Sequence, residues 1–185
     1  LKRLAQIISL KDIGRIITLL GITKDSVVVE SGAGSGAATV YLAHVAKQVH
    51  TYEIAKEHLE VAQENADILG ANNASFYHKD IYDKANVKAH EADAFLLDVP
   101  EPVKALQSVT KALRIGGRCV IYTPNLTQAQ EAILNLPSSL MYEGTVELTE
   151  RQWSIKERIL RPVMQGLGHT AFLTTVRKVP EGDDV

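Results

Sequence analysis

A glycine-rich turn between an apolar strand and a helix constrains the fold of this chain more than any other feature of its sequence. Residues 27–29 are three valines, and they lead directly into residues 30–36, with the sequence E-S-G-A-G-S-G. A short run that is apolar at every position is typical of a strand buried on both faces of a parallel sheet. A helical pattern follows over about residues 37–47. Because glycines at such a turn let a ligand approach the backbone closely, the sequence predicts a binding loop here.

Further strand-like runs alternate with helical patterns along the chain. They occupy residues 49–52, 75–78, 94–97, 118–122, 141–148 and 171–176, which together with the valine run make seven. The connections between them are short. This alternation predicts an α/β fold with a doubly wound, mainly parallel sheet.

Capping residues indicate where several helices begin and end. The first helix is expected to have Asp12 as its N-cap and Gly21 just past its end. Thr127 and Gln130 have the spacing of a capping box, which predicts that another helix begins there. In the less regular last third, a polar helix is expected between the strand-like runs at residues 141–148 and 171–176.

Three of the predicted strands end at a carboxylate, namely Glu53, Asp80 and Asp98. A single carboxylate at a strand end is often only a cap. In open α/β sheets, however, ligands lie over the carboxyl ends of the strands. We therefore expect these three side chains and the glycine-rich turn to form one binding site.

The residue types at these strand ends favour a nucleoside cofactor. Glu53 can accept hydrogen bonds from both hydroxyls of a ribose, a feature that NAD-binding and S-adenosylmethionine-binding proteins share. Asp80 can accept the amino group of an adenine while the neighbouring Ile81 covers the ring.

Two classes of nucleoside cofactor remain open at the glycine-rich turn. Gly32, Gly34 and Ala37 satisfy the relaxed G-x-G-x-x-G/A fingerprint of dinucleotide-binding proteins, which keeps an NAD-linked oxidoreductase as an alternative. The sequence offers no convincing catalytic residue for that chemistry, and it has no phosphate-binding G-x-x-x-x-G-K-[ST] motif. Glu30 would be unfavourable near a pyrophosphate but fits the ammonium group of a methionine moiety, which favours S-adenosylmethionine.

The overall charge gives no argument for nucleic-acid binding. The formal net charge is −2 at pH 7, so any RNA contact must come from local basic patches. Taken singly, each such patch is more often a solvated surface. The candidates are Arg114 with Arg118, Lys156 with Arg158 and Arg161, and Arg177 with Lys178.

Composition also bears on compartment and metal content. The single cysteine, Cys119, excludes an internal disulfide and accords with a reducing cytoplasm. The six histidines have no metal-ligand spacing. No apolar run approaches the length of a membrane span, and no secretory signal is visible. We therefore expect a cytoplasmic protein with neither a metal site nor a membrane partner.

Several motifs, in their order along the chain, resemble those of the tRNA adenine-58 N1-methyltransferases. Residues 98–102, D-V-P-E-P, and residues 124–128, P-N-L-T-Q, are the most distinctive, because most other methyltransferases lack both. The remaining similar stretches span nearly the whole chain: Ala5-Gln6-Ile7-Ile8 with Lys11-Asp12, residues 29–36, Tyr52-Glu53-Ile54, Gly116-Gly117-Arg118, Arg161-Pro162 and residues 168–173.

The resemblance implies a class I, Rossmann-like methyltransferase that uses S-adenosylmethionine and acts on tRNA. The sheet of that class has seven strands, of which the last is antiparallel. The residues that the resemblance places around the cofactor are Gln6, Glu30, Gly32, Ala33, Gly34, Ser35, Gly36, Ala37, Ala38, Glu53, His58, Asp80, Ile81 and Asp98.

The resemblance also implies that Asp98 is catalytic and faces the target adenine. Enzymes that methylate the amino group of adenine usually carry an Asn or Asp, two prolines and an aromatic residue at this point. Val99 and Glu101 break that pattern here, so methylation of a different adenine atom, N1, is expected.

The resemblance implies a homo-oligomer, with a tetramer as the expected state. We expect residues 1–185 to form a single methyltransferase domain, in which residues 1–22 are a lead-in segment and helix. The family that the chain resembles usually has a small amino-terminal β-rich module, and we expect none within residues 1–185.

Two further alternatives remain. A class I methyltransferase that acts on another RNA, a protein or a small molecule would keep the cofactor residues. This alternative does not explain the motifs at residues 98–102 and 124–128. A non-catalytic tRNA-binding partner subunit would be expected to lose the cofactor residues, which are retained here.

Overall fold

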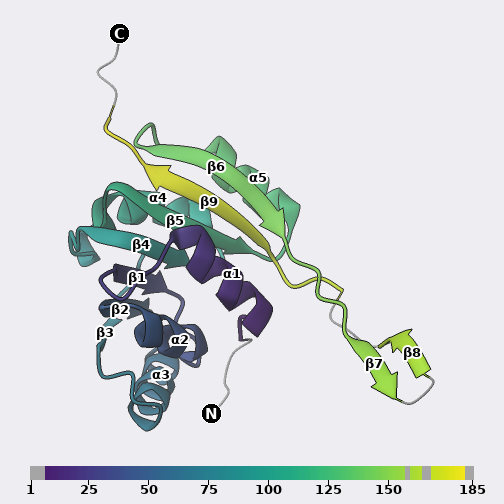
Figure 1. Ribbon diagram of the computed structural model, residues 1–185. Helices are drawn as coiled ribbons and strands as arrows, with labels where there is room; N and C mark the ends of the chain where they lie inside the picture. Colours follow the sequence, from purple (N-terminus) through teal and green to yellow (C-terminus); the bar gives the residue numbers. More distant parts are fainter. Residues whose placement is uncertain (1–6, 157–158, 164–167, 182–185) are drawn as a thin grey trace.

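The computed structural model of the 185-residue chain describes residues 7–156, 159–163 and 168–181. In this part of the chain, seven strands form one sheet with the order β3-β2-β1-β4-β5-β9-β6 (Figure 1). The strands of this sheet are β1 (Val27–Ser31), β2 (Gln48–Glu53), β3 (Ala74–His78), β4 (Ala92–Leu97), β5 (Leu113–Thr123), β6 (Leu140–Glu147) and β9 (Phe172–Lys178).

The strand directions confirm the predicted sheet. Strands β1 to β5 pair with one another in parallel, whereas β9 is antiparallel to both of its neighbours, β5 and β6. The fold is therefore α/β and doubly wound, with a mainly parallel sheet whose last strand is antiparallel.

Helices cover both faces of the sheet. They are α1 (Leu10–Leu20), α2 (Ala37–Val45), α3 (Lys56–Ile68), α4 (Pro102–Ala112) and α5 (Leu126–Leu134), with a short 3-10 helix, η1 (Lys84–Asn86). Helices α1, α2 and α3 contribute to one hydrophobic core, and α4 and α5 contribute to the other.

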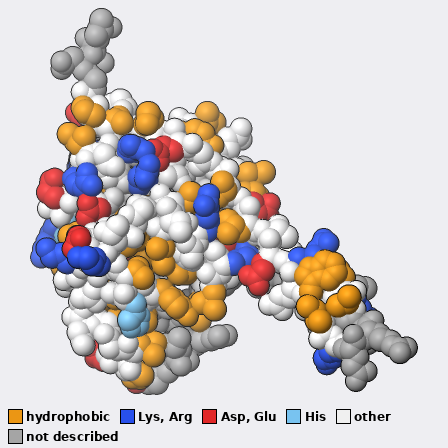
Figure 2. All heavy atoms as spheres, viewed as in Figure 1, with side chains coloured by type: hydrophobic (Ala, Val, Ile, Leu, Met, Phe, Trp, Pro, Cys, Tyr) orange, Lys and Arg blue, Asp and Glu red, His pale blue; other side chains and the backbone are white. Residues whose placement is uncertain are grey.

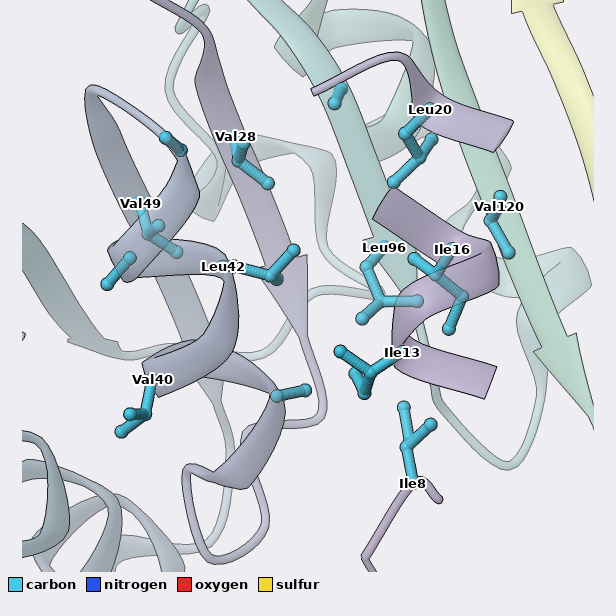
Figure 3. Packing of buried hydrophobic residues seen from close by; sticks show 14 of the residues in the cluster. Ile8, Ile13, Ile16, Leu20, Val28, Val40, Leu42, Val49, Leu96 and Val120 are labelled. Carbon is cyan, nitrogen blue, oxygen red and sulfur yellow. The ribbon is translucent and has the colours of Figure 1, made fainter. Parts of the chain in front are cut away.

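Alternation along the central strands supplies both cores. On β1, Val28 belongs to the core under α1 and α2, whereas the next residue, Val29, belongs to the core under α4. Figure 3 shows Ile13 and Ile16 of α1 lying over Leu96 of β4, and all three side chains are buried. Because neighbouring residues of a strand point to opposite faces, a fully apolar strand is what a sheet covered on both sides requires.

Two of the expected helix caps are wrong. Helix α1 begins at Leu10 with Ser9 as its N-cap, so Asp12 lies inside the first turn, although Gly21 does end the helix in the left-handed conformation. Helix α5 begins after Asn125, whose side chain accepts a hydrogen bond from the backbone of Gln128, and not at Thr127. In both cases another residue with a good capping side chain lies two or three positions earlier in the chain.

The polar helix expected before the last strand is also wrong. The described residues of that segment form a hairpin of two antiparallel strands, β7 (Trp153–Lys156) and β8 (Ile159–Pro162). Figure 1 shows this hairpin standing away from the rest of the molecule. Its side chains alternate between the two faces of a ribbon, so the segment has the period of a strand and not of a helix.

Candidate functional site

The glycine-rich turn connects β1 to α2 and has a backbone that other residues would not tolerate. Gly32, Gly34 and Gly36 all have positive φ values, of 90°, 53° and 77°. At Gly36, a Cβ atom would lie 2.8 Å from the Cα atom of Ala62 in α3. These glycines therefore allow both the turn itself and the close packing of α3 against it.

Glu53 closes β2 and is fixed by the turn. Its Oε2 accepts a hydrogen bond from the backbone of Gly34 at 3.1 Å, and its Oε1 accepts one from the backbone of Ala55 at 2.9 Å. The side chain is buried. Because each carboxylate oxygen can accept more than one hydrogen bond, the group can also accept from ligand hydroxyls.

A cavity of about 380 Å³ opens beside Glu53, at the carboxyl ends of the strands. Seven of the predicted site residues line it, namely Gly32, Gly34, Glu53, His58, Asp80, Ile81 and Asp98. The strand ends thus bring these residues together, as expected for an open α/β sheet.

The other predicted residues do not line this cavity. Ala33, Ser35, Gly36, Ala37 and Ala38 form the buried part of the turn and the start of α2 behind it. Glu30 lies within β1, and Gln6 lies outside the described residues.

Glu30 is buried within β1, two residues before Gly32 of the glycine-rich turn. Its Oε2 accepts hydrogen bonds from the hydroxyls of Thr39 at 2.6 Å and Thr51 at 2.9 Å. Burial raises its pKa to about 7 against the effect of these two bonds, and the negative charges of Asp98 and Glu53 act in the same direction as burial. Burial therefore makes Glu30 easier to protonate near neutral pH than an exposed glutamate.

Asp98 follows β4 directly and lies beside the glycine-rich turn. Its backbone donates a hydrogen bond to the carbonyl of Ser31 at 3.0 Å. Burial raises the pKa of its carboxyl to about 7, and the charge of Glu53 adds to this effect. A carboxyl group with this pKa can both accept and release a proton near neutral pH.

The three carboxylates at this site have little positive charge beside them. Among the described residues, no ion pair involves Glu30, Glu53 or Asp98. Lys79 is the only lysine or arginine among the described residues that line the cavity, and its side chain is exposed. The site therefore favours a ligand that carries positive charge.

Asp80 and Ile81 lie at the far end of the cavity, after β3. One oxygen of Asp80, Oδ1, accepts a hydrogen bond from the backbone of Tyr82 at 2.8 Å. Ile81 is buried and belongs to the core under α4, so that it offers a fixed apolar wall.

Several lining residues were not predicted from the sequence. Tyr82 is the most informative of them, because its hydroxyl accepts a hydrogen bond from the backbone of Glu101 at 3.2 Å. This bond joins the loop after β3 to the loop after β4 across the mouth of the cavity. No motif or spacing signals this contact. The others are Ser31, Tyr52, Ile54, Ala55, Lys79, Val99 and Pro100, most of which adjoin a predicted site residue in the sequence.

In two of the three basic patches named from the sequence, the side chains form ion pairs or hydrogen bonds with other residues of the chain. Arg114 pairs with Asp93 at 2.8 Å, and both Arg118 and Arg177 pair with Glu143. Lys178 donates to the carbonyl of Leu113 at 2.6 Å. In the third patch, Lys156 and Arg161 are exposed on the β7–β8 hairpin, and Arg158 lies outside the described residues.

The described residues contain no cluster of His, Cys, Asp and Glu suited to a metal ion. Within the same residues, no helix has the length and apolar character that crossing a membrane requires. Cys119 is buried and unpaired.

The sheet order, the antiparallel last strand and the cavity at the carboxyl ends of its strands define a Rossmann-like methyltransferase fold. Residues 1–170 match the family described as "tRNA methyltransferase complex GCD14 subunit", and the chain belongs to that family.

Individual relatives agree with this assignment. The chain is 31% identical over 172 residues to a tRNA (adenine(58)-N(1))-methyltransferase TrmI of Thermus thermophilus, covering 91% of this chain and 68% of the relative. It is 30% identical over 210 residues to tRNA (adenine(57)-N(1)/adenine(58)-N(1))-methyltransferase TrmI of Methanocaldococcus jannaschii, covering 98% and 74%. It is similar to the crystal structure of tRNA (m1A58) methyltransferase TrmI from Aquifex aeolicus, with a TM-score of 0.87, 32% identity and coverage of 96% and 72%.

Proposed function

We propose that the protein transfers a methyl group from S-adenosylmethionine to N1 of an adenine in tRNA, at position 58. The observation that carries this proposal is the convergence of Glu53, Asp80 and Asp98 on one cavity beside the glycine-rich turn. The names of the relatives support the same substrate.

The residues present fit S-adenosylmethionine. A cofactor with a sulfonium and an ammonium group would supply the positive charge that Glu30, Glu53 and Asp98 lack. In this assignment Glu53 accepts from the ribose hydroxyls, while Asp80 accepts from the adenine amino group and Ile81 packs against the ring. Glu30 acts from beneath the turn, through its charge, since it does not line the cavity.

The bound cofactor supplies an electrophilic methyl group on its sulfonium sulfur. Adenine N1 has a lone pair, so no proton must leave before it attacks, but methylation makes the base cationic. Asp98 accepts a hydrogen bond from the exocyclic amine, which orients the base and stabilises the developing charge. With a pKa of about 7, Asp98 can afterwards take a proton from that amine. N1 lies on the pairing edge, so the nucleotide must be exposed or flipped out.

The experiment that tests this proposal is methylation of unmodified tRNA with labelled cofactor, followed by mapping of the modified nucleotide. Asp98→Asn should reduce kcat roughly a hundredfold or more, and it should reduce cofactor affinity by much less. Asp83→Asn is the matched control, because Asp83 caps η1 through one oxygen and does not line the cavity. Label at another nucleotide, or full turnover by Asp98→Asn, would contradict the assignment.

The same fold could methylate a different acceptor, namely another RNA, a protein or a small molecule. Such an enzyme would bind the cofactor through the same residues, so cofactor binding alone does not distinguish the two functions. The two functions are distinguished by a competition experiment, in which methylation of tRNA is measured in the presence of RNA, protein and metabolite fractions from cells.

We also propose that the protein is cytoplasmic and forms a homo-oligomer, with a tetramer as the proposed oligomeric state. The β7–β8 hairpin supports self-association, because an isolated two-stranded hairpin is marginally stable in water at best. Figure 2 shows hydrophobic side chains on its surface, next to basic ones. Trp153, Ile155 and Leu160 are 57%, 74% and 71% exposed, and burial against a second copy would remove this apolar surface from water.

A further inference from the structure

His169 bridges two segments of the chain that are far apart in the sequence. It precedes β9, and its Nδ1 lies 2.6 Å from Oε1 of Glu147, the last residue of β6. Its Nε2 lies 2.8 Å from the backbone carbonyl oxygen of Pro124, directly after β5. One imidazole ring therefore spans β6 and the loop that leads into α5.

Both partners of this ring are hydrogen-bond acceptors. The carbonyl of Pro124 can only accept, so Nε2 must carry a proton. An ionised Glu147 can also only accept, so Nδ1 must carry a proton as well. An imidazolium can donate to both oxygens at these distances, whereas a neutral ring would turn a lone pair toward one of them.

The surroundings of the ring agree with this charge state. The hydrogen bond to Glu147, and then the one to Pro124, raise the pKa of His169 above its usual value. Lys11 of α1 opposes this through its charge, and it is held nearby by bonds to Thr170 and to the carbonyl of Leu148. The ring of Phe172 lies 4.8 Å away, centroid to centroid, and carries no charge.

The segment that His169 holds lies beside the methyl-acceptor side of the site. Strand β5 is the neighbour of β4, with Ile121 opposite Leu97, so Tyr122 and Thr123 lie next to Asp98 at the sheet edge. Pro124 and Asn125 continue β5 beyond that edge, and Asn125 caps α5. Leu126, which follows, is 59% exposed.

We propose that His169, as an imidazolium, is a positioning residue that fixes residues 124–126 as one wall of the acceptor site. Loss of its proton breaks one of the two bonds, frees this wall and weakens binding of the acceptor RNA. The role in RNA binding rests on the proposed function, whereas the charge state of the ring and its hold on the loop do not.

The first experiment measures the ring and the loop directly by NMR. In the wild-type protein, the pKa of His169 from imidazole nitrogen shifts should lie above the ordinary value of about 6.5. Glu147→Gln should lower it. His169→Gln should increase the mobility of residues 125–126 in amide relaxation at one fixed pH, and His169→Arg, a permanent cation with several donors, should restore their order.

The second experiment follows catalysis. His169→Gln should raise KM for tRNA roughly two- to tenfold, the worth of one hydrogen bond, and leave cofactor affinity unchanged. As pH rises through the pKa of His169, KM for tRNA should rise in the wild type but not in His169→Arg. A direct phosphate contact by His169 would instead reduce the salt dependence of tRNA affinity in His169→Gln, by about one in the logarithmic slope.

The outcomes separate this proposal from the proposed function. A pKa of His169 at or below about 6.5, unchanged order of residues 125–126 in His169→Gln, or the reduced salt slope would overturn the positioning role. If the wild type methylates no tRNA but the NMR results are as expected, the proposed function fails and the role of His169 in holding the loop stands.

Discussion

Gly32 and Asp98 lie so close together that a Cβ atom on Gly32 would be 1.8 Å from the backbone carbonyl oxygen of Asp98. The glycine-rich turn and the acceptor-side carboxylate are therefore in direct backbone contact. This contact places the glycine-rich turn and the proposed catalytic residue in one rigid unit, so a substitution at one of them should displace the other.

Gly32→Ala should abolish cofactor binding and destabilise the protein. The added methyl group meets a backbone atom that cannot move away, and the φ of 90° is strained for any residue with a Cβ. The strain alone is worth about 1–3 kcal/mol of unfolding free energy. Gly14→Ala is the control, because nothing lies within 4 Å of its Cβ position and it is inside α1. For Gly14→Ala, chemical denaturation should show that the free energy of unfolding increases by roughly 0.5–1 kcal/mol. Equal effects of the two substitutions would contradict the strain assigned to Gly32→Ala.

Glu53→Gln should weaken binding of S-adenosylmethionine. The amide keeps only one accepting oxygen, while two backbone N–H groups, those of Gly34 and Ala55, already point at this side chain. Loss of charge-assisted hydrogen bonds is worth about 1.5–3 kcal/mol, or roughly ten- to a hundredfold in Kd by calorimetry. Glu57→Gln, in the first turn of α3 and outside the cavity, should bind as the wild type does.

Stability of the ligand-free protein should fall as pH rises from about 4.5 to 7. The folded-state pKa of Glu30 is raised from 4.5 to about 7, so between these values the unfolded state binds fewer protons than the folded state. Its ionisation then costs the folded state on the order of 3 kcal/mol. Asp98, whose pKa is raised from 3.8 to about 7, contributes a decline of the same sign. Denaturant titrations across this pH range should show the combined decline, and Glu30→Gln should reduce it while leaving the part that Asp98 contributes. A wild-type profile that rises with pH would contradict the shifted pKa.

Binding of S-adenosylmethionine near pH 7 should release protons. Glu30 and Asp98 both have pKa values of about 7, and a cationic ligand stabilises their ionised forms and lowers both values. Because the two carboxyl groups interact, the number of protons released belongs to the pair and not to either residue. Calorimetry in buffers of different ionisation enthalpy measures this release. Binding of S-adenosylhomocysteine, which lacks the sulfonium charge, should release fewer protons. Equal proton release by the two ligands would show that the sulfonium does not act on these groups.

The β7–β8 hairpin should carry part of the self-association. Ile155→Lys places a charge in the apolar surface that a second copy would cover, so sedimentation should shift toward smaller species. Ile68→Lys makes the same change at a residue that is 70% exposed on α3 and should leave the assembly intact. Cofactor affinity should be unchanged in both variants. A monomeric wild type, or an Ile155→Lys protein that assembles normally, would rule out the hairpin as the contact.

The sequence alone predicted the sheet and seven of the residues that line the cavity at the carboxyl ends of its strands. The three valines of β1 could be assigned to a strand buried on both faces, because the apolar run is short, β-branched and bounded by a glycine-rich turn. Glu53, Asp80 and Asp98 could be grouped because parallel strands deliver their carboxyl ends to one edge. The resemblance to tRNA methyltransferases was confirmed by the family to which the chain belongs.

Local signals were less reliable where several residues could perform the same task. Ser9 and Asp12 are both good N-caps, and only the path of the chain into α1 makes Ser9 the cap. Strand β7 is only four residues long and largely exposed, so its sequence lacks the fully apolar run that identifies a buried strand such as β1.

Contacts between distant segments were decided only by the tertiary structure. The hydroxyl of Tyr82 reaches the loop of Glu101, and His169 reaches Pro124, 45 positions away. Neither contact has a spacing that a sequence can display, because each depends on how the strands and the loops after them are arranged in the folded sheet. The raised pKa values of Glu30 and Asp98 were also decided only by the tertiary structure. Burial is the largest cause of both shifts, and these side chains are buried only in the folded protein.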